Sequence, residues 1–354
     1  MRLAHVVDEP YDSGIVHYAL TAARGLRDAG HQVEVWGRPD AFPLREAARL
    51  GLPTVALAGL RDLWSARQAA QESRIELLNA HTGSSHTLSL ALAHSLAERP
   101  RIVRTRAEAR PARRTPAGSV LWRRTAGFIA PTNVILAQFK KLYPAVSCPA
   151  ATIYPGIEGT EAGPEPDGPP RVGIIGRLDP VKGHADFLRA AAQVAVQFPQ
   201  ARFLIAGREE NVKRAQLEAL LSNLGLRGRA ELLGHVPDAL AFIRSCHIGV
   251  VASTGSEAVS RAAIEWMSAG RPVVATAVGC LPELIESGLS GILVPPSDAR
   301  EMAAAISALL GGAELRRRIG ERARRRFESH FSFPRFIRET ERFYEQTLHD
   351  IPSR

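Results

Sequence analysis

Cysteine is scarce in this chain of 354 residues. Cys148, Cys246 and Cys280 form an odd set without the spacing of a metal site, and the apolar neighbours of the last two predict buried, reduced thiols. Long apolar runs are also absent, since no stretch of about 20 such residues is available to cross a membrane. Because Met1 leads directly into an expected strand and not into a signal peptide, we expect a cytosolic protein.

Acidic residues are outnumbered by basic ones, 36 against 45, which gives a formal net charge of +9. This excess favours anionic partners, such as a nucleoside diphosphate, an acidic lipid surface or a phosphorylated acceptor. An arginine-rich proteome is an alternative explanation of the same excess. Hydrophobic residues make up 45% of the chain, enough for a large core, which argues against global disorder.

The first residues have the pattern of a βαβ unit. An apolar strand at Leu3–Val7 is followed by a loop that contains Gly14, a helix with apolar residues at helical spacing, and a second strand that begins at Val33. This opening is typical of a Rossmann-like half. No Gly-x-Gly-x-x-Gly segment follows the first strand, so a Rossmann oxidoreductase is disfavoured.

The length is sufficient for about two domains of ordinary size. Glycine and proline are concentrated in residues 157–170, which predicts a linker between an N-terminal Rossmann-like domain at 1–156 and a second one at 171–334. A final helix is expected within 335–354. Further strands are expected at Thr54–Leu57, Ile75–Asn79, Ile102–Thr105, Gly127–Ala130 and Ala151–Tyr154, and in the second domain near Val172–Ile175, Phe203–Ala206, Ala230–Leu233, Ile248–Ala252, Val273–Thr276 and Ile292–Val294.

Two glutamates follow the apolar strand Ile248–Ala252. Glu257 lies in the loop at the carboxyl end of that strand, and Glu265 lies about two turns along the helix that follows. Carboxylates at this separation suit two sets of hydroxyls on one elongated ligand, such as the sugar and the ribose of a nucleotide sugar. Two solvated glutamates on a surface helix are the alternative.

Two cations follow the strand Val172–Ile175. Arg177 and Lys182 lie in a glycine-containing loop that leads into a helix, where a diphosphate is favoured by the helix N-terminus and by both side chains. Taken alone they resemble ordinary surface charges. Ligands bind outside the carboxyl ends of strands in such sheets, so the cations and the glutamates are expected to face one crevice.

These motifs, in this order, resemble a known family. Gly176-Arg177-Leu178 with Lys182-Gly183, the pair Glu257 and Glu265, the segment 270–275 (Gly-Arg-Pro-Val-Val-Ala) and the segment 288–294 (Gly-Leu-Ser-Gly-Ile-Leu-Val) are similar to motifs of GT-B glycosyltransferases of the retaining family 4 type. The resemblance implies an α/β fold with two Rossmann-like domains facing a central cleft. It also implies that the helix at 335–354 packs back on the first domain, which would bind the acceptor.

The same resemblance assigns roles to the donor-binding residues. Arg177 and Lys182 would neutralise the diphosphate leaving group, Glu257 would bind hydroxyls of the donor sugar, and Glu265 would bind the ribose. The remaining donor-side positions are Gly14, which aligns with the second of two glycines at the first strand-to-helix turn, the backbone amides of Val259 and Ser260, and the nucleobase-side loop that begins at Gly234 and contains His235. At 258–260 the chain has Ala-Val-Ser where the family often has Gly-Phe-Gly.

The acceptor side is expected on the first domain. His81 begins a segment, His81-Thr82-Gly83-Ser84-Ser85-His86, that resembles the histidine-containing acceptor loop of the family, although a structural histidine is the alternative. Many relatives have a histidine near Ala107, and its absence here makes Arg106 or Glu108 the candidate acceptor contact. Nine arginines and one acid occur in 99–124, with Trp122 among them. This stretch is either a surface for an anionic membrane or lipid-linked acceptor, or a solvated basic loop.

We therefore expect a glycosyltransferase that moves a sugar from a nucleoside-diphosphate sugar to an acceptor hydroxyl with retention, in cell-surface glycan, lipopolysaccharide or glycolipid synthesis. No Asp-x-Asp occurs, so we expect no metal and no cofactor beyond the nucleotide sugar. The expected partners are the nucleotide sugar, a glycan or lipid-linked acceptor and an anionic membrane contacted peripherally from the cytoplasm, but no nucleic acid. The alternatives are a nucleotide-sugar epimerase of GT-B fold and a non-catalytic nucleotide-sugar-binding protein.

Overall fold

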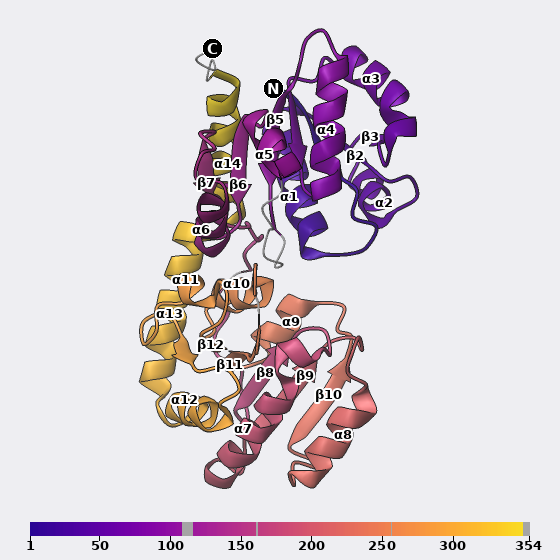
Figure 1. The fold of residues 1–354 in the computed structure, drawn as a ribbon. Coiled ribbons are helices and arrows are strands. Elements are labelled where there is room, and N and C mark those ends of the chain that lie inside the picture. The colour runs from indigo at the N-terminus through magenta and orange to yellow at the C-terminus, as the bar shows by residue number, and fades with distance from the viewer. Residues whose placement is uncertain (108–115, 161, 256, 350–354) are drawn as a thin grey trace. The chain divides into compact units, whose positions relative to one another are not determined.

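The structure is a computed structural model that describes all residues except 108–115, 161, 256 and 350–354 (Figure 1). Contacts between residues divide the chain into two compact units. The first consists of Met1–Gly156 and Phe333–Arg354, and the second of Ile157–Ser332. Each unit is an α/β Rossmann-like domain with one parallel sheet, as the sequence predicted.

The first unit has a seven-stranded sheet in the order β3-β2-β1-β4-β5-β6-β7, and all neighbouring strands run parallel. Its strands are β1 (Arg2–Val7), β2 (Gln32–Gly37), β3 (Thr54–Ala56), β4 (Leu77–Ala80), β5 (Arg101–Thr105), β6 (Gly127–Ala130) and β7 (Ala150–Thr152). The helices between them are α1 (Gly14–Asp28), α2 (Phe42–Arg49), η1 (Leu60–Asp62), α3 (Leu63–Glu72), α4 (Gly83–Ser95), α5 (Pro116–Arg123) and α6 (Asn133–Leu142).

The central strand β1 is apolar on both faces because helices cover both sides of the sheet. Leu3 and Val7 belong to one buried cluster, while Ala4 and Val6 belong to another. Near-continuous apolar strands of this kind are typical of parallel sheets buried on both faces. The polar exception is His5, which is also fully buried.

Helix α14 (Phe333–His349) belongs to the first unit although it ends the chain. Phe336, Ile337 and Tyr344 pack into the same cluster as Leu3. Outside this core, His31 contacts Glu341 at 2.7 Å between Nε2 and Oε1. A long amphipathic helix thus completes the core of a domain that begins some 300 residues earlier in the chain (Figure 1).

The second unit has a six-stranded parallel sheet in the order β10-β9-β8-β11-β12-β13. Its strands are β8 (Arg171–Ile175), β9 (Arg202–Ala206), β10 (Ala230–Gly234), β11 (Ile248–Val251), β12 (Val273–Thr276) and β13 (Ile292–Val294). The helices are η2 (Pro180–Lys182), α7 (His184–Gln197), α8 (Arg214–Asn223), α9 (Ala239–Arg244), α10 (Arg261–Ser268), α11 (Leu281–Leu284), α12 (Ala299–Gly311) and α13 (Ala313–His330).

Arginines bind the start of the predicted linker to the second unit. Their donors reach three residues of the segment from distant parts of the sequence, so this part of the chain is ordered by long-range contacts. The contacts are Arg316 with Glu165 at 2.6 Å, Arg271 with the Pro164 carbonyl at 2.7 Å, and Arg244 with the Thr160 hydroxyl at 2.9 Å. Part of the arginine excess is therefore structural.

Within the described residues, no helix combines the length and apolar character needed to cross a bilayer. The longest described helix, α13, is rich in arginine and glutamate.

Candidate functional site

The centre of the candidate site is an ion pair between Lys182 and Glu257. Lys182 ends η2, in the loop after β8, and Glu257 lies in the loop after β11. These strands are neighbours in the sheet, so their carboxyl ends lie together. The Nζ of Lys182 donates to Oε1 of Glu257 at 2.5 Å, and the hydroxyl of Ser253 donates to the same oxygen. Glu257 is only 5% exposed, so its carboxylate depends on these two donors.

Gly183 allows the two loops to approach closely. It has a φ of +67°, and a Cβ at this position would overlap the carbonyl oxygen of Ala252 at the end of β11. The amide of Thr254 donates to the carbonyl of Val181 at 2.9 Å, which joins the same loops again. In the pair Lys182-Gly183, the close approach of the two loops therefore requires the glycine, and the ion pair with Glu257 requires the lysine.

Arg177 follows β8 as predicted but has a different partner. Its guanidinium lies 3.5 Å from Glu210, in the loop after β9, and the side chain is about half exposed. Asp179 in the same loop accepts from the amide of Val181 at 3.0 Å. Burial raises the pKa of Asp179, but the hydrogen bonds from Val181 and Asn211 and the charges of Arg177 and Lys182 outweigh burial and leave the pKa lowered.

Glu265 lies on α10, where the sequence predicted a helix. It is 8% exposed, and Arg261, one turn earlier, contacts its Oε1 at 3.0 Å. Ser260 is buried directly before the helix, and Val259 is half-buried. The structure thus carries Glu257, Ser260 and Glu265 on one continuous loop-and-helix segment after β11.

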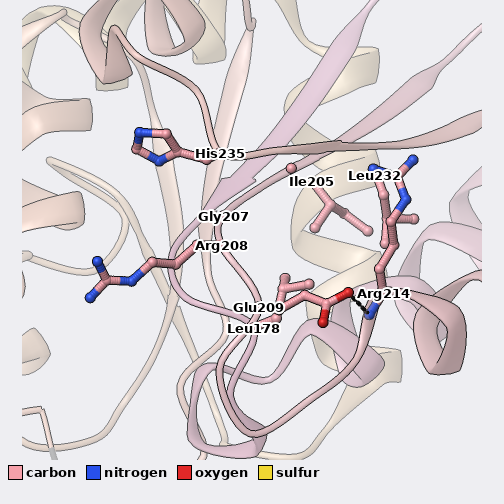
Figure 2. A pocket seen from close by; sticks show the side chains of 9 residues that line it. Leu178, Ile205, Gly207, Arg208, Glu209, Arg214, Leu232 and His235 are labelled. Atoms are coloured by element: carbon pink, nitrogen blue, oxygen red, sulfur yellow. Dashed lines mark hydrogen bonds between the residues drawn. The ribbon is translucent and has the colours of Figure 1, made fainter.

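A pocket of about 290 Å³ lies along the same edge of the sheet. It is formed at the carboxyl ends of β8, β9 and β10, and Figure 2 shows His235 and Arg208 on one side of it and Ile205 and Leu232 on the other. The amide of Arg214 donates to Glu209 at 3.0 Å, which is the dashed line in Figure 2. This bond, together with Lys213, lowers the pKa of Glu209. The pocket is lined by Leu178, Ile205, Gly207, Arg208, Glu209, Arg214, Leu232, Gly234 and His235.

The candidate residues of the first unit are less accessible. His81 is fully buried, and its Nε2 shares a hydrogen bond of 2.9 Å with Nδ1 of His5. Burial, with the charge of Arg104 adding to it, keeps the pKa of His81 well below its ordinary value. Arg106 follows β5 and is 6% exposed, while Glu108 lies outside the described residues.

Gly14 is the first residue of α1, capped by Ser13, whose hydroxyl accepts from the amide of Val16. Gly14 is exposed, and a Cβ at this position would have room in the structure.

Trp122, the tryptophan of the basic stretch 99–124, is not exposed in the structure. Trp122 is 8% exposed, and its ring lies 4.6 Å from that of Phe139 and 5.1 Å from that of His86. The indole is therefore part of an aromatic cluster and is withdrawn from any surface contact. Residues 108–115 of this stretch lie outside the described part of the chain.

Sequence reasoning missed three features of the site. Of these features, Ser253 is the one that the sequence came nearest to indicating, because it is a polar residue directly after an apolar strand. His184, which follows Lys182-Gly183, is buried, and burial lowers its pKa to about 4, so it is neutral. Arg208 and Glu209 have no motif of their own and are recognised only because β9 adjoins β8.

Comparison with known proteins identifies the family. The model described as Glycosyltransferase Family 4 matches residues 13–160, and the one described as Glycosyl transferases group 1 matches residues 159–326. An alpha-D-kanosaminyltransferase from Streptomyces kanamyceticus is 35% identical over 44% of this chain and 40% of its own length. A phosphatidyl-myo-inositol mannosyltransferase from Mycolicibacterium smegmatis is 29% identical over 89% of this chain and 86% of its own length. The alignment thus spans less than half of the kanosaminyltransferase.

Solved structures share the fold over nearly the whole chain. HepE from Anabaena, solved in complex with UDP, has a TM-score of 0.85 at 19% identity and covers 98% of this chain and 100% of its own. A glycosyltransferase from Rickettsia africae has a TM-score of 0.87 at 17% identity and covers 99% of both chains. The two family models together run from residue 13 to residue 326, and the fold agrees with them, so the chain belongs to the GT-B glycosyltransferases of the family 4 type.

Proposed function

We propose that this protein transfers a glycosyl group from a nucleoside-diphosphate sugar to an acceptor hydroxyl, with retention of anomeric configuration and without a metal ion. One observation carries the proposal. The Lys182–Glu257 pair and the pocket lined by Gly234 and His235 lie along one carboxyl edge of the second sheet. Ligands of open parallel sheets bind at this edge, and the nucleotide sugar would extend along it from the pocket to the pair.

The donor is oriented by its polar ends. The pocket holds the nucleobase, and Glu265 accepts hydrogen bonds from the ribose hydroxyls. Arg177 and Lys182 neutralise the diphosphate, while Glu257 accepts from hydroxyls of the transferred sugar. The amides of Val259 and Ser260 donate to the sugar or phosphate. In this arrangement each charged group of the ligand has a partner of opposite charge or a hydrogen-bond donor.

The reaction places its developing charge on the diphosphate. The acceptor oxygen bonds to the anomeric carbon on the face that the leaving group departs from, the bond from that carbon to the diphosphate oxygen breaks, and a donor phosphate oxygen takes the acceptor proton. Arg177, Lys182 and helix-end amides stabilise the leaving group, a role that Asp-x-Asp motifs with a metal fulfil in the other main glycosyltransferase fold. Glu257 is bound by Lys182 and Ser253, which suits a hydrogen-bond acceptor better than a nucleophile.

We further propose that the acceptor is part of a cell-surface glycan or glycolipid and is bound through the first unit. The name of the mannosyltransferase relative, which aligns over 89% of this chain, supports a lipid-linked or cyclitol acceptor. On the first unit, Arg106, which is buried directly after β5, is the candidate acceptor contact, whereas Gly14 remains a predicted donor-side position. Membrane association from the cytoplasmic side is compatible with such an acceptor.

The test begins with a thermal-shift panel of uridine and guanosine diphosphate sugars on the full chain, followed by turnover of the best ligand with inositol phosphates and phosphatidylinositol as acceptors. Proton NMR of the product reads the anomeric configuration. A product of inverted configuration contradicts the proposed mechanism. Conversion of the donor to its epimer in the absence of acceptor would instead favour an epimerase.

A further inference from the structure

Two large apolar side chains of the first unit are exposed within one helical turn. Leu60, in η1, is 75% exposed, and Trp64, at the start of α3, is 69% exposed. The opposite side of α3 packs into the core through Ala66 and Ala70, beside α4 (Figure 1). Leu60 and Trp64 therefore contribute nothing to the core and remain in water.

Trp64 differs from the other tryptophans of the chain. All four lie in the described part of the structure; Trp36 and Trp266 are fully buried, and Trp122 is 8% exposed. Keeping an indole in water forgoes the favourable free energy of its burial. An exposed tryptophan beside an exposed leucine is thus a candidate contact with an apolar partner.

Cations flank these side chains. Arg61 and Arg67 are both exposed, and Arg67 is anchored at one side of α3 by a bond from its Nε to the Ser95 carbonyl at 3.1 Å. The nearest acid, Asp62, accepts from the amides of Ala58 at 2.7 Å and Gly59 at 3.0 Å, so its charge is directed at the backbone. The other acid of α3, Glu72, ends the helix about two turns beyond Trp64.

We propose that the surface formed by Leu60, Arg61, Trp64 and Arg67, here named the Leu60–Arg67 surface, docks on an anionic lipid bilayer. The indole lies at the headgroup level, Leu60 enters the acyl boundary, and the two guanidinium groups meet lipid phosphates. Trp122 cannot act as such an anchor in the described structure, because it is buried.

Size and charge favour a bilayer over a protein partner. A stable protein interface buries about 800 Å² on each side, contributed by about 20 to 30 residues. The Leu60–Arg67 surface has four residues, which suffices for insertion into a bilayer but not for such an interface. A second copy of the chain carries the same net charge of +9 and would meet cations with cations.

The experiment uses the full chain with two kinds of vesicle, phosphatidylcholine alone and phosphatidylcholine with phosphatidylglycerol. Cosedimentation measures binding, and tryptophan emission reports Trp64, because the other three indoles are already buried. The variants are Leu60→Ser with Trp64→Ser, and Arg61→Gln with Arg67→Gln. Val196→Ser is the matched control, since Val196 is an apolar residue on α7 of the second unit that is 83% exposed.

Wild type and Val196→Ser should bind the anionic vesicles alike, with a blue shift of emission and weaker binding at high salt. The apolar double variant should bind at least about tenfold more weakly and lose the blue shift. The arginine double variant should bind about twenty-five-fold more weakly, since each arginine near an anionic surface is worth about fivefold.

Binding of wild type without a blue shift, or equal binding by all variants, would overturn the proposal. So would Trp64-dependent self-association in gel filtration with no vesicle binding, because it would assign the surface to a second copy. The docking inference does not depend on the proposed transfer reaction, and turnover of a water-soluble acceptor should be unchanged in these variants.

Discussion

Replacing Lys182 by methionine separates a structural role of the ion pair from a catalytic one. The change removes the 2.5 Å contact with Glu257 and leaves a carboxylate that is 5% exposed with the Ser253 hydroxyl alone. Removing one partner of a buried ion pair typically costs about 3–5 kcal/mol. Because the Lys182 side chain is 29% exposed and water can partly take its place, we expect a smaller loss than this range, about 2–3 kcal/mol in the free energy of unfolding.

The double variant Lys182→Met with Glu257→Gln completes the cycle. Glutamine at position 257 carries no charge, so the double variant has no buried carboxylate that lacks its cation. Most of the lost free energy of unfolding should therefore return, with a coupling energy of about 2 kcal/mol between the two positions. Turnover should not return. Lys182→Met, Glu257→Gln and the double variant should each turn over about a hundredfold or more slowly, because each lacks the leaving-group contact, the sugar contact or both.

Urea unfolding followed by circular dichroism gives the stabilities, and initial rates with a saturating donor give turnover. Arg189→Met is the control, because Arg189 forms a 2.7 Å pair with Asp186 on the surface of α7 and is about half exposed. Its stability should change by less than about 0.5 kcal/mol and its turnover not at all. If the double variant recovers turnover together with stability, Lys182 acts only through the fold, and its assignment to the diphosphate is wrong.

Three further outcomes are expected. Turnover should survive excess EDTA, because Arg177 and Lys182 take the place of a metal, and loss on chelation that Mg²⁺ restores would contradict this. Glu265→Ala should weaken binding of the free nucleoside diphosphate about tenfold, whereas Glu257→Ala should barely change it and should depress turnover; equal losses in calorimetry would refute the division between ribose and sugar. Burial lowers the pKa of His5 and of His86 to about 3, so only the unfolded chain takes up these protons as the pH falls below about 6.5. The free energy of unfolding should then fall by about 1.4 kcal/mol per histidine and pH unit down to about pH 3, and a pH-independent difference between wild type and His86→Gln in urea titrations would contradict it.

Strands were predictable from sequence wherever an apolar run had clear ends. Gly127–Ala130, Val273–Thr276 and Ile292–Val294 are strands over the residues expected. The prediction for Ile75–Asn79 was displaced, since β4 runs from Leu77 to Ala80. Arg74 has a φ of +48°, and the amide of Ile75 donates to Ala70, so both residues close the end of α3. A non-glycine residue in the left-handed region leaves no signal in sequence.

The linker prediction shows a different limit. Glycine and proline in 157–170 predict irregular backbone, and the segment indeed contains no described helix or strand. Composition does not indicate what such backbone contacts. Glu165 is bound by Arg316, 151 residues later, and Thr160 by Arg244. Only the folded domain brings these arginines to the segment, so its attachment to the second unit could not be read from neighbouring residues.

The two tryptophans near basic residues show the same limit for surfaces. The sequence singled out Trp122 because nine arginines occur in 99–124. Phe128, Phe139 and Tyr143 bury it, and their proximity depends on how β6 and α6 pack. Trp64 has fewer arginines nearby but is exposed, because α3 turns its alanines to the core. Local charge predicts an exposed binding surface only after the burial of the neighbouring side chains has been determined.

The support of Glu257 explains why the order of motifs was a better guide than any single residue. Gly279 has a φ of +55°, and a Cβ there would overlap the backbone of Glu257, so the loop after β12 presses against the glutamate. The amide of Cys280 donates to the Glu257 carbonyl at 2.8 Å, while Gly183 admits the loop after β8 from the other side. The backbone of Glu257 is thus held by the loop after β12 and its carboxylate by Lys182, while the loop after β8 packs against Ala252, five residues before the glutamate. A carboxylate restrained in this way loses little entropy when it binds a hydroxyl, and the restraint combines Gly183 of the Lys-Gly motif with Gly279, which lies between the segments 270–275 and 288–294.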